Sequence, residues 1–342
     1  MRFFILFVLL ALTPQSPDSF PPLGLIDFYG LRTVSEAQVR QALGIHEGEP
    51  VDVNKIEEIQ KSAEQRIAAI PGVKAAFLNF GCCTEDRKAT LYVGIQENTT
   101  RCTSFDRAPT GQVRLTDDVV RAGSEFETAF VRAIEAGDSV EDDSEGHALN
   151  HNSQVRAIQE RFIRLVETHL ANLKDVLRDS SDPDQRALAA QVLAYAKDKQ
   201  SVVPDFVSAM HDPASNVRNS AARALVVFSR DRPKPPALKI QVPSQPFIEM
   251  LNSCIWTDRN KSSLALAELT DSRDPALLAE IRKDALPSLI EMSHWKLKGH
   301  AEPSLVMLGR IGGLSEEQIQ KDLDAGDRQA LLSAAGNANP TK

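Results

Sequence analysis

An internal repeat in the second half of the chain constrains its fold more than any other feature. The segment LKDVLRDSSDPDQRALAAQVLAYA (173–196) aligns with FVSAMHDPASNVRNSAARALVVFS (206–229) at a shift of 32 or 33 residues. The positions that coincide are Leu177 with Met210, Asp179 with Asp212, Arg186 with Arg218, and Leu193 with Leu225. A period in this range is typical of stacked helical pairs, each of which buries its apolar side against its neighbours. The repeat therefore predicts an all-α solenoid.

Two looser units follow the repeat. Residues 247–251 with 264–269, and residues 285–292 with 304–311, are the expected third and fourth helix pairs. The insert DRPKPPALKIQVPSQP (231–246) carries five prolines, which exclude a continuous helix, so we expect it to loop out. The solenoid is thus predicted over residues 151–314, followed by a C-terminal helix and flexible tail over residues 315–342.

These units resemble HEAT repeats, and more closely the short HEAT-like repeats first described in bilin lyases. The match is good over residues 173–229 and weaker from 240 to 313. The resemblance implies that a turn aspartate and a second-helix arginine bond between layers. It also implies an extended concave surface that binds protein. We interpret four residues as structural on this ground, namely Asp179, Arg186, Asp212 and Arg218. Nothing in the sequence supports bilin chemistry.

The N-terminal region, residues 23–97, has a different pattern. The apolar run LIDFYG (25–30) predicts a strand, and Ser35 with Gln38 forms a capping box at the start of a helix. Asp52 is expected to cap a second helix, which ends at Pro71-Gly72. Two strand-like runs, VKAAFLNF and KATLYVGIQE, complete the order strand, helix, helix, strand, strand. This order predicts a small α+β domain with a three-stranded sheet.

The same region resembles a POTRA (polypeptide-transport-associated) domain. The matching residues are Phe28-Tyr29-Gly30, Val34-Ser35, Val39, Leu43, Gly48, Asp52, Pro71-Gly72-Val73, Leu91, Val93, Ile95 and Glu97. The resemblance implies a docking module of the cell envelope, and a sheet edge that can accept a strand from a partner. The alternative is a structural βααββ domain without a partner of its own.

The N-terminus predicts export. In MRFFILFVLLALTPQS, Arg2 precedes ten apolar residues, too few to cross a bilayer of ~30 Å as a helix but typical of a secretory signal. We expect a signal peptide within residues 1–20 and a protein of the periplasm or cell envelope, peripheral to the membrane at most. An uncleaved anchor is the alternative.

The four cysteines bear on the same question, because disulfides persist in oxidising compartments. They are Cys82, Cys83, Cys102 and Cys254. We favour buried thiols or one disulfide over a metal site, since no CxxC pair completes a zinc set. The sequence leaves the pairing open.

Residues 98–150 are expected to be an acidic connector. One amphipathic helix is predicted there from Val119, Val120, Phe126, Phe130 and Ile134. Five acidic residues then lie between Asp138 and Glu145, near His147 and His151, but without the ligand spacing of an EF-hand. We interpret this acidic stretch as a solvated linker.

Two groups of residues are candidates for a functional site. Trp256, Asp258, Arg259 and Lys261 are of the types found in binding hot spots, although Trp256 could instead fill a gap between layers. Glu291, His294 and His300 could supply three metal ligands, but the neighbouring Lys296 and Lys298 would oppose a cation. We therefore expect no metal and no cofactor.

The sequence as a whole favours a non-catalytic scaffold or adaptor that binds protein partners in the bacterial envelope. A formal charge of −8 without a Lys/Arg block argues against nucleic acid. No G-x-S-x-G, P-loop or G-x-G-x-x-G motif is present. The alternatives are a metal-dependent enzyme, using the Glu/His group or the acidic stretch with His147 and His151, and a purely structural protein.

Overall fold

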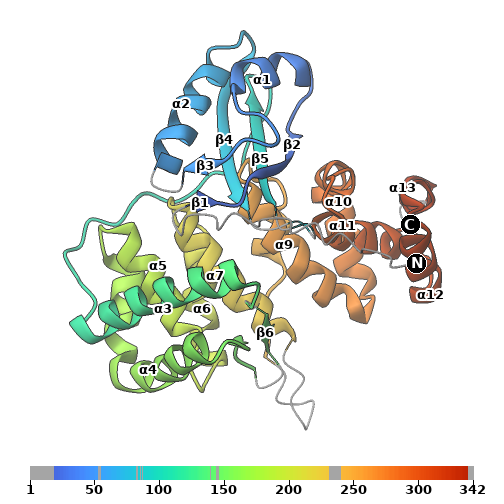
Figure 1. Cartoon of the computed structure of the whole chain (residues 1–342). Helices are drawn as coiled ribbons and strands as arrows, with labels where there is room; N and C mark the ends of the chain where they lie inside the picture. The colour runs from blue at the N-terminus through green and yellow to red at the C-terminus, as the bar shows by residue number, and fades with distance from the viewer. Residues whose placement is uncertain are drawn as a thin grey trace, which may run out of the picture. The chain divides into compact units, whose positions relative to one another are not determined.

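The computed structural model describes residues 19–52, 55–81, 84, 86, 88–138, 140–143, 146–230 and 240–337 (Figure 1). The chain divides into two compact units, one up to Asn98 and one from Thr99 onward. The predicted signal peptide up to residue 18, Cys82, Cys83 and most of the proline-rich insert lie outside the described residues. None of the described helices has the length and apolarity needed to span a membrane.

The N-terminal unit contains the predicted succession of strands and helices. Its elements are β1 (Ser19–Phe20), β2 (Leu23–Tyr29), α1 (Glu36–Leu43), β3 (Val51–Asp52), α2 (Ile56–Ala68), β4 (Val73–Gly81) and β5 (Ala89–Glu97). The three-stranded sheet has the order β2-β5-β4, in which β5 runs parallel to β2 and antiparallel to β4. Strands β1 and β3 form a separate antiparallel pair. The central strand β5 is buried along its whole length.

Local signals set the ends of the helices in this unit. Ser35 and Gln38 form the expected capping box at α1, and Gly44 ends the helix with a left-handed φ of 62°. Asp52 does not cap α2 as expected, because it lies in β3 and Lys55 precedes the helix. The apolar sides of both helices join the sheet in one core, which includes Ile26, Val39, Leu43, Ala63, Ile67, Leu91 and Val93.

A buried carboxylate at the end of β5 fixes the loop between β2 and α1. Glu97 accepts hydrogen bonds from the backbone N–H groups of Arg32, Thr33 and Val34 at 2.7–2.9 Å and from the Thr33 hydroxyl. Burial by itself would raise the pKa of Glu97, but these four donors together lower it from 4.5 to about 2. The loop is therefore held by an ionised side chain.

Side chains of α2 close part of the outer edge of β4. The Gln60 side chain donates to the Leu78 carbonyl at 2.8 Å, and the Glu64 carboxylate accepts from the Leu78 N–H at 2.8 Å. These are the groups that an added strand would need for pairing. Strand addition to β4 therefore requires displacement of α2 at this residue.

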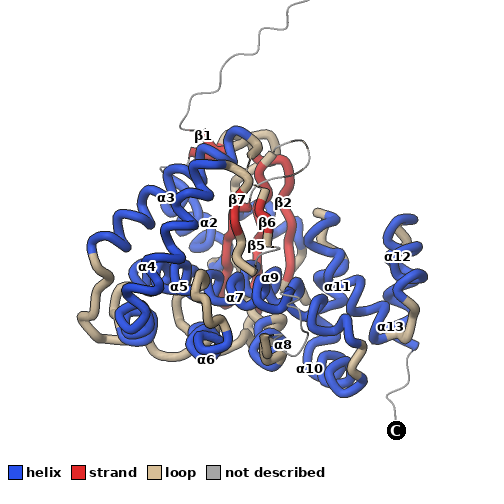
Figure 2. Tube along the Cα trace, turned by 90° about the horizontal axis from the view of Figure 1, so that it is seen from below, coloured by secondary structure: helices blue, strands red, loops and turns tan. Residues whose placement is uncertain are grey.

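The second unit is a stack of helix pairs. Its elements are α3 (Asp117–Ala136), β6 (Glu141–Asp142), β7 (Leu149–Asn150), α4 (Ser153–Asp179), α5 (Pro183–Leu193), the 3-10 turn η2 (Gln200–Val202), α6 (Val203–Ala209), α7 (Ser215–Arg230), α8 (Gln245–Met250), α9 (Trp256–Leu269), the 3-10 turn η4 (Thr270–Ser272), α10 (Pro275–Ser293), α11 (Lys298–Ile311), α12 (Glu316–Ala325) and α13 (Arg328–Asn337). The second helices of successive pairs, α5, α7, α9 and α11, pack side by side in one layer. Figure 2 shows this row and, beside it, the first helices α4, α6, α8 and α10.

The predicted acidic connector folds with this unit. The amphipathic helix is α3, which packs on α4 and α5. Gly123 of α3 lies so close to Leu188 that a Cβ atom at position 123 would be 2.6 Å from the leucine side chain. Part of the acidic stretch pairs as the short hairpin β6–β7, with Glu141 opposite Asn150. The stretch is thus, in its described part, folded rather than a solvated linker, because its carboxylates find cationic partners on α7.

The C-terminal region also differs from the expectation of one helix and a flexible tail. Gly326, with a φ of 69°, separates two helices, α12 and α13. The small residues Gly309 of α11 and Gly312, which directly follows that helix, admit Leu331 and Ala334 of α13 at close range. This packing makes α12 and α13 a fifth pair among the described residues, and residues 338–342 lie outside them.

Candidate protein-interaction surface

Buried ion pairs connect successive helix pairs of the stack. The guanidinium of Arg186 donates to both carboxylate oxygens of Asp212 at 2.7 and 2.8 Å, and also to the Ser180 carbonyl at 2.8 Å. Arg186 is 1% exposed and Asp212 is 8% exposed. A buried bidentate ion pair of this kind fixes the positions of both side chains, and loss of either one leaves the other as an uncompensated buried charge.

The same connection recurs further along the stack. Arg218 donates to the Asp258 carboxylate at 2.9–3.1 Å, and Arg259 donates to Glu291 at 2.5 Å. An arginine near the start of a second helix therefore reaches a carboxylate of the next pair three times in succession. We call this series the arginine ladder (Arg186, Arg218 and Arg259 with their partners).

Asp179 has no place in the arginine ladder. Its carboxylate pairs with Arg178 of its own helix at 2.8 Å and is 45% exposed. Asp182 precedes a proline in the first turn, and Asp212 precedes a proline in the second. The Asp182 carboxylate accepts a hydrogen bond from Arg114 at 2.6 Å. The alignment at a shift of 33 matched the wrong aspartate, because the two turns differ in length.

An extended segment before α3, which we call the strap (residues 102–115), runs across the turns of the stack. A disulfide joins Cys102 to Cys254 before α9, with 5.4 Å between the Cα atoms. Further along, the Asp106 N–H donates to the His211 carbonyl at 2.8 Å. The Gly111 N–H then donates to the Asp179 carbonyl at 2.9 Å. The strap thus crosses three successive pairs in reverse order.

Side chains of the strap contact the arginine ladder. The Arg218 guanidinium lies 3.6 Å from the centroid of the Phe105 ring, a distance at which a cation and an aromatic face attract. At the far end of the strap, Arg114 pairs with Asp182 at 2.6 Å, and this pair is partly exposed, unlike the buried pairs of the ladder. Residues 99–115 have no periodic pattern of apolar side chains, so the strap was not predicted.

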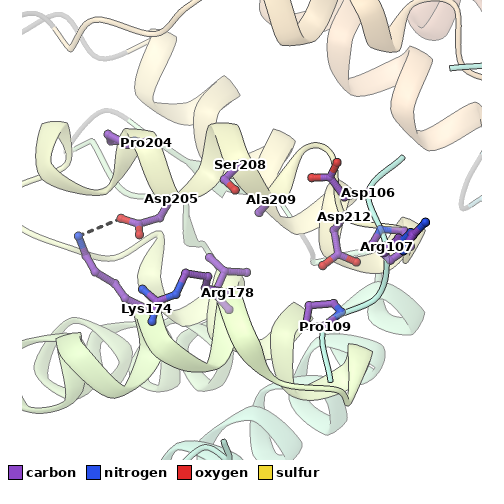
Figure 3. A pocket seen from close by; sticks show the side chains of 12 residues that line it. Asp106, Arg107, Pro109, Lys174, Arg178, Pro204, Asp205, Ser208, Ala209 and Asp212 are labelled. Atoms are coloured by element: carbon purple, nitrogen blue, oxygen red, sulfur yellow. Dashed lines mark ion pairs between the residues drawn. The ribbon is translucent and has the colours of Figure 1, made fainter. Parts of the chain in front are cut away.

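A solvent-open cavity of about 270 Å³ lies between the strap and the helices α4 and α6 (Figure 3). Asp106, Arg107 and Pro109 of the strap line one side. The Lys174–Asp205 ion pair, at 2.9 Å, lines the other. Among the described residues, neither Asp106 nor Arg107 takes part in an ion pair. The cavity is thus lined by charged side chains from the strap and from both helices.

The four predicted binding residues are divided between different environments. Trp256 is 8% exposed and packs against Trp295 and His300, with ring centroids 6.5 and 5.1 Å away, so it fills the space between α9 and α11. Asp258 and Arg259 are buried in the arginine ladder. Lys261 alone of the four lies beside other surface charges of the second helices, near Arg223 and Arg230 of α7.

The Glu/His group does not form a metal site. Glu291 is held by Arg259, whereas His294 is exposed at the C-terminal end of α10. His300 packs on Trp256, and burial lowers its pKa to about 4 with a further contribution from Lys261. In the part of the chain that the structure describes, no three His, Cys, Asp or Glu side chains are grouped closely enough to hold a metal ion.

One family match agrees with the helical repeat. Residues 170–242 match the family of HEAT repeats. Among solved structures, a computationally designed armadillo repeat protein for modular peptide recognition is 16% identical, with a TM-score of 0.38 over 55% of this chain and 94% of its own. A second designed armadillo repeat protein is 14% identical, with a TM-score of 0.35 over 54% of this chain and 94% of its own. No curated protein sequence matches the chain. The unit from Thr99 onward is thus a stack of helix pairs in which residues 170–242 are similar to HEAT repeats.

Proposed function

We propose that this protein is an exported, non-catalytic scaffold that binds protein partners through its helical repeat. The observation that carries the proposal is the stack of helix pairs, which presents a long surface with a side-chain-sized cavity under the strap. Stacked repeats commonly use such extended surfaces for protein recognition. The arginine ladder makes the stack rigid, because its arginines form ion pairs with carboxylates of the next helix pair.

Export to an oxidising compartment is part of this proposal. The signal-like N-terminus supports it, and so does the disulfide between Cys102 and Cys254 in the helical unit. Reducing cytosol keeps most such cysteine pairs as thiols. The N-terminal unit, with the strand and helix order of a POTRA-like domain, would then dock to an envelope partner while the solenoid holds another.

The proposal is tested with a photo-crosslinking amino acid placed in the full-length protein in its host. Arg107 and Ser208 are exposed positions in the cavity lining, and Gln320 is an exposed control position on α12. We expect discrete crosslinked products from the two cavity positions and none from the control. Absence of a discrete product from both cavity positions would contradict protein binding at this surface.

Compartment is tested separately with a membrane-impermeant thiol reagent and cell fractionation. An exported chain is recovered outside the cytosol, with Cys102 and Cys254 resistant to alkylation until a reductant is added. Recovery in the cytosol with both thiols reactive would exclude export and leave the crosslinking result unaffected.

A further inference from the structure

Three cations on neighbouring second helices form a surface that the scaffold function does not explain. We define the basic cluster as Arg223, Arg230 and Lys261. Arg223 and Arg230 are seven residues apart on α7, which puts them on one side of the helix about two turns apart. Lys261 of α9 lies close enough to both for their charges to act on it.

The acidic hairpin (β6–β7) covers this cluster with carboxylates. Glu141 forms an ion pair with Arg223, and Asp143 lies 3.5 Å from Arg230. Glu141 and Asp143 are two positions apart in the chain, and both carboxylates contact arginines of α7. The Tyr195 hydroxyl donates to the carbonyl of Ala148, the residue before β7, at 3.0 Å and so links this side of the hairpin to the stack.

Charges are unevenly matched along the two helices. Arg230 has two carboxylate partners, Asp143 at 3.5 Å and Glu268 of α9 at 3.1 Å. Arg223 has Glu141, while Lys261 forms no ion pair within the described residues. Burial first, and then the nearby Arg223 and Arg230, lower the pKa of Lys261 to about 8. The charges of Arg223 and Lys261 would therefore stabilise an additional carboxylate placed close to both side chains.

We propose that the basic cluster is a binding site for an extended acidic peptide with carboxylates at alternate positions, and that the acidic hairpin occupies this site in the same chain until a partner displaces it. The proposal rests on the proposed function and specifies the chemistry of one partner. Without the hairpin carboxylates, Glu268 is the counter-charge that the described residues would leave to the three cations. The site then favours a chain that brings two or more carboxylates together.

The test uses purified full-length protein and a fluorescein-labelled (Glu-Ser)4 peptide, with (Gln-Ser)4 as the neutral probe. Binding is followed by fluorescence anisotropy at low and physiological salt. The Glu141→Gln/Asp143→Asn variant should bind the acidic peptide about tenfold more tightly than the parent, since two partly exposed ion pairs no longer compete. The neutral probe should not bind.

Lys261→Gln, added to that variant, should lower the affinity about fivefold, and Lys261→Arg should preserve it. Lys321→Gln, at an exposed lysine of α12, is the control and should change nothing. Equal affinity in parent and hairpin variant, or no effect of Lys261→Gln, would overturn the proposal. Should the hairpin variant fail to fold, Lys261→Gln in the parent chain decides the matter through loss of its weaker binding. Crosslinking at Arg107 and Ser208 is independent of this result, so the scaffold function can stand if the acidic site fails.

Discussion

Removal of the disulfide between Cys102 and Cys254 should destabilise the helical unit strongly. The bond closes a loop with a sequence separation of 152 residues. The entropy that such a loop removes from the unfolded chain corresponds to about 5 kcal/mol at 25 °C. In the folded state the strap keeps its backbone bonds to the turns and the contact of Phe105 with Arg218, so the effect lies mainly in the unfolded state.

The measurement is urea unfolding of the full-length Cys102→Ala/Cys254→Ala variant beside the oxidised parent, followed by far-UV circular dichroism. With a slope of about 3 kcal/mol/M, a loss of this size moves the midpoint by about 1.7 M. Each single variant should lose as much as the double variant, because all three lack the same bond. A double variant whose midpoint stays within about 0.3 M of the parent would refute the loop-entropy reasoning.

Three further predictions concern stability. Glu97→Gln should lower the free energy of unfolding by about 2 kcal/mol, because a neutral amide makes weaker hydrogen bonds to the loop. Folding lowers the pKa of the Glu97 carboxyl, so in the parent its contribution to stability is present above pH 4.5 and is lost as the pH falls towards about 2. A pH series of chemical melts checks both, and a pH-independent difference would contradict the mechanism. Arg218→Met should lower the free energy of unfolding by about 3–5 kcal/mol, because it leaves Asp258 buried without its cation. Adding Asp258→Leu should recover much of this loss. A double variant that is no more stable than Arg218→Met would argue against the ladder as a series of ion pairs. Gly123→Ala should cost about 1–3 kcal/mol through its clash with Leu188, and thermal melts should show that Leu188→Ala relieves that part of the loss.

The repeat residues show how far sequence reasoning reached. The resemblance to HEAT repeats implied that Asp212 and Arg218 bond between layers, and Arg186 was interpreted as structural. In the structure Arg186 pairs with Asp212 and Arg218 with Asp258 of the next pair. The Asp179 carboxylate pairs with Arg178 of its own helix instead of the next pair, because helix periodicity fixes the faces of helices but not the length of the turns between them. The ladder continues to Arg259, where the sequence repeat had become too loose to follow.

The roles of the candidate binding and metal residues could be decided only from their neighbours in the tertiary structure. A Glu/His pair on one helix indicates only that two side chains share a face. Whether they converge with a third depends on the neighbouring helix, and here Arg259 engages Glu291 instead. Trp256 was likewise indistinguishable as a hot spot or a packing residue until its neighbours Trp295 and His300 were known.

The sequence by itself determined the two kinds of fold in this chain, because hydrophobic periodicity, capping residues and a repeat of 32 or 33 residues are local properties. It also located α1, α3 and the helices of the first two pairs. Only the tertiary structure decided that the strap crosses the turns, that Cys102 pairs with Cys254, and that the acidic hairpin covers the cations of α7. Those contacts join residues up to 152 positions apart, and an extended segment without periodic side chains carries no local signal of where its backbone will bind.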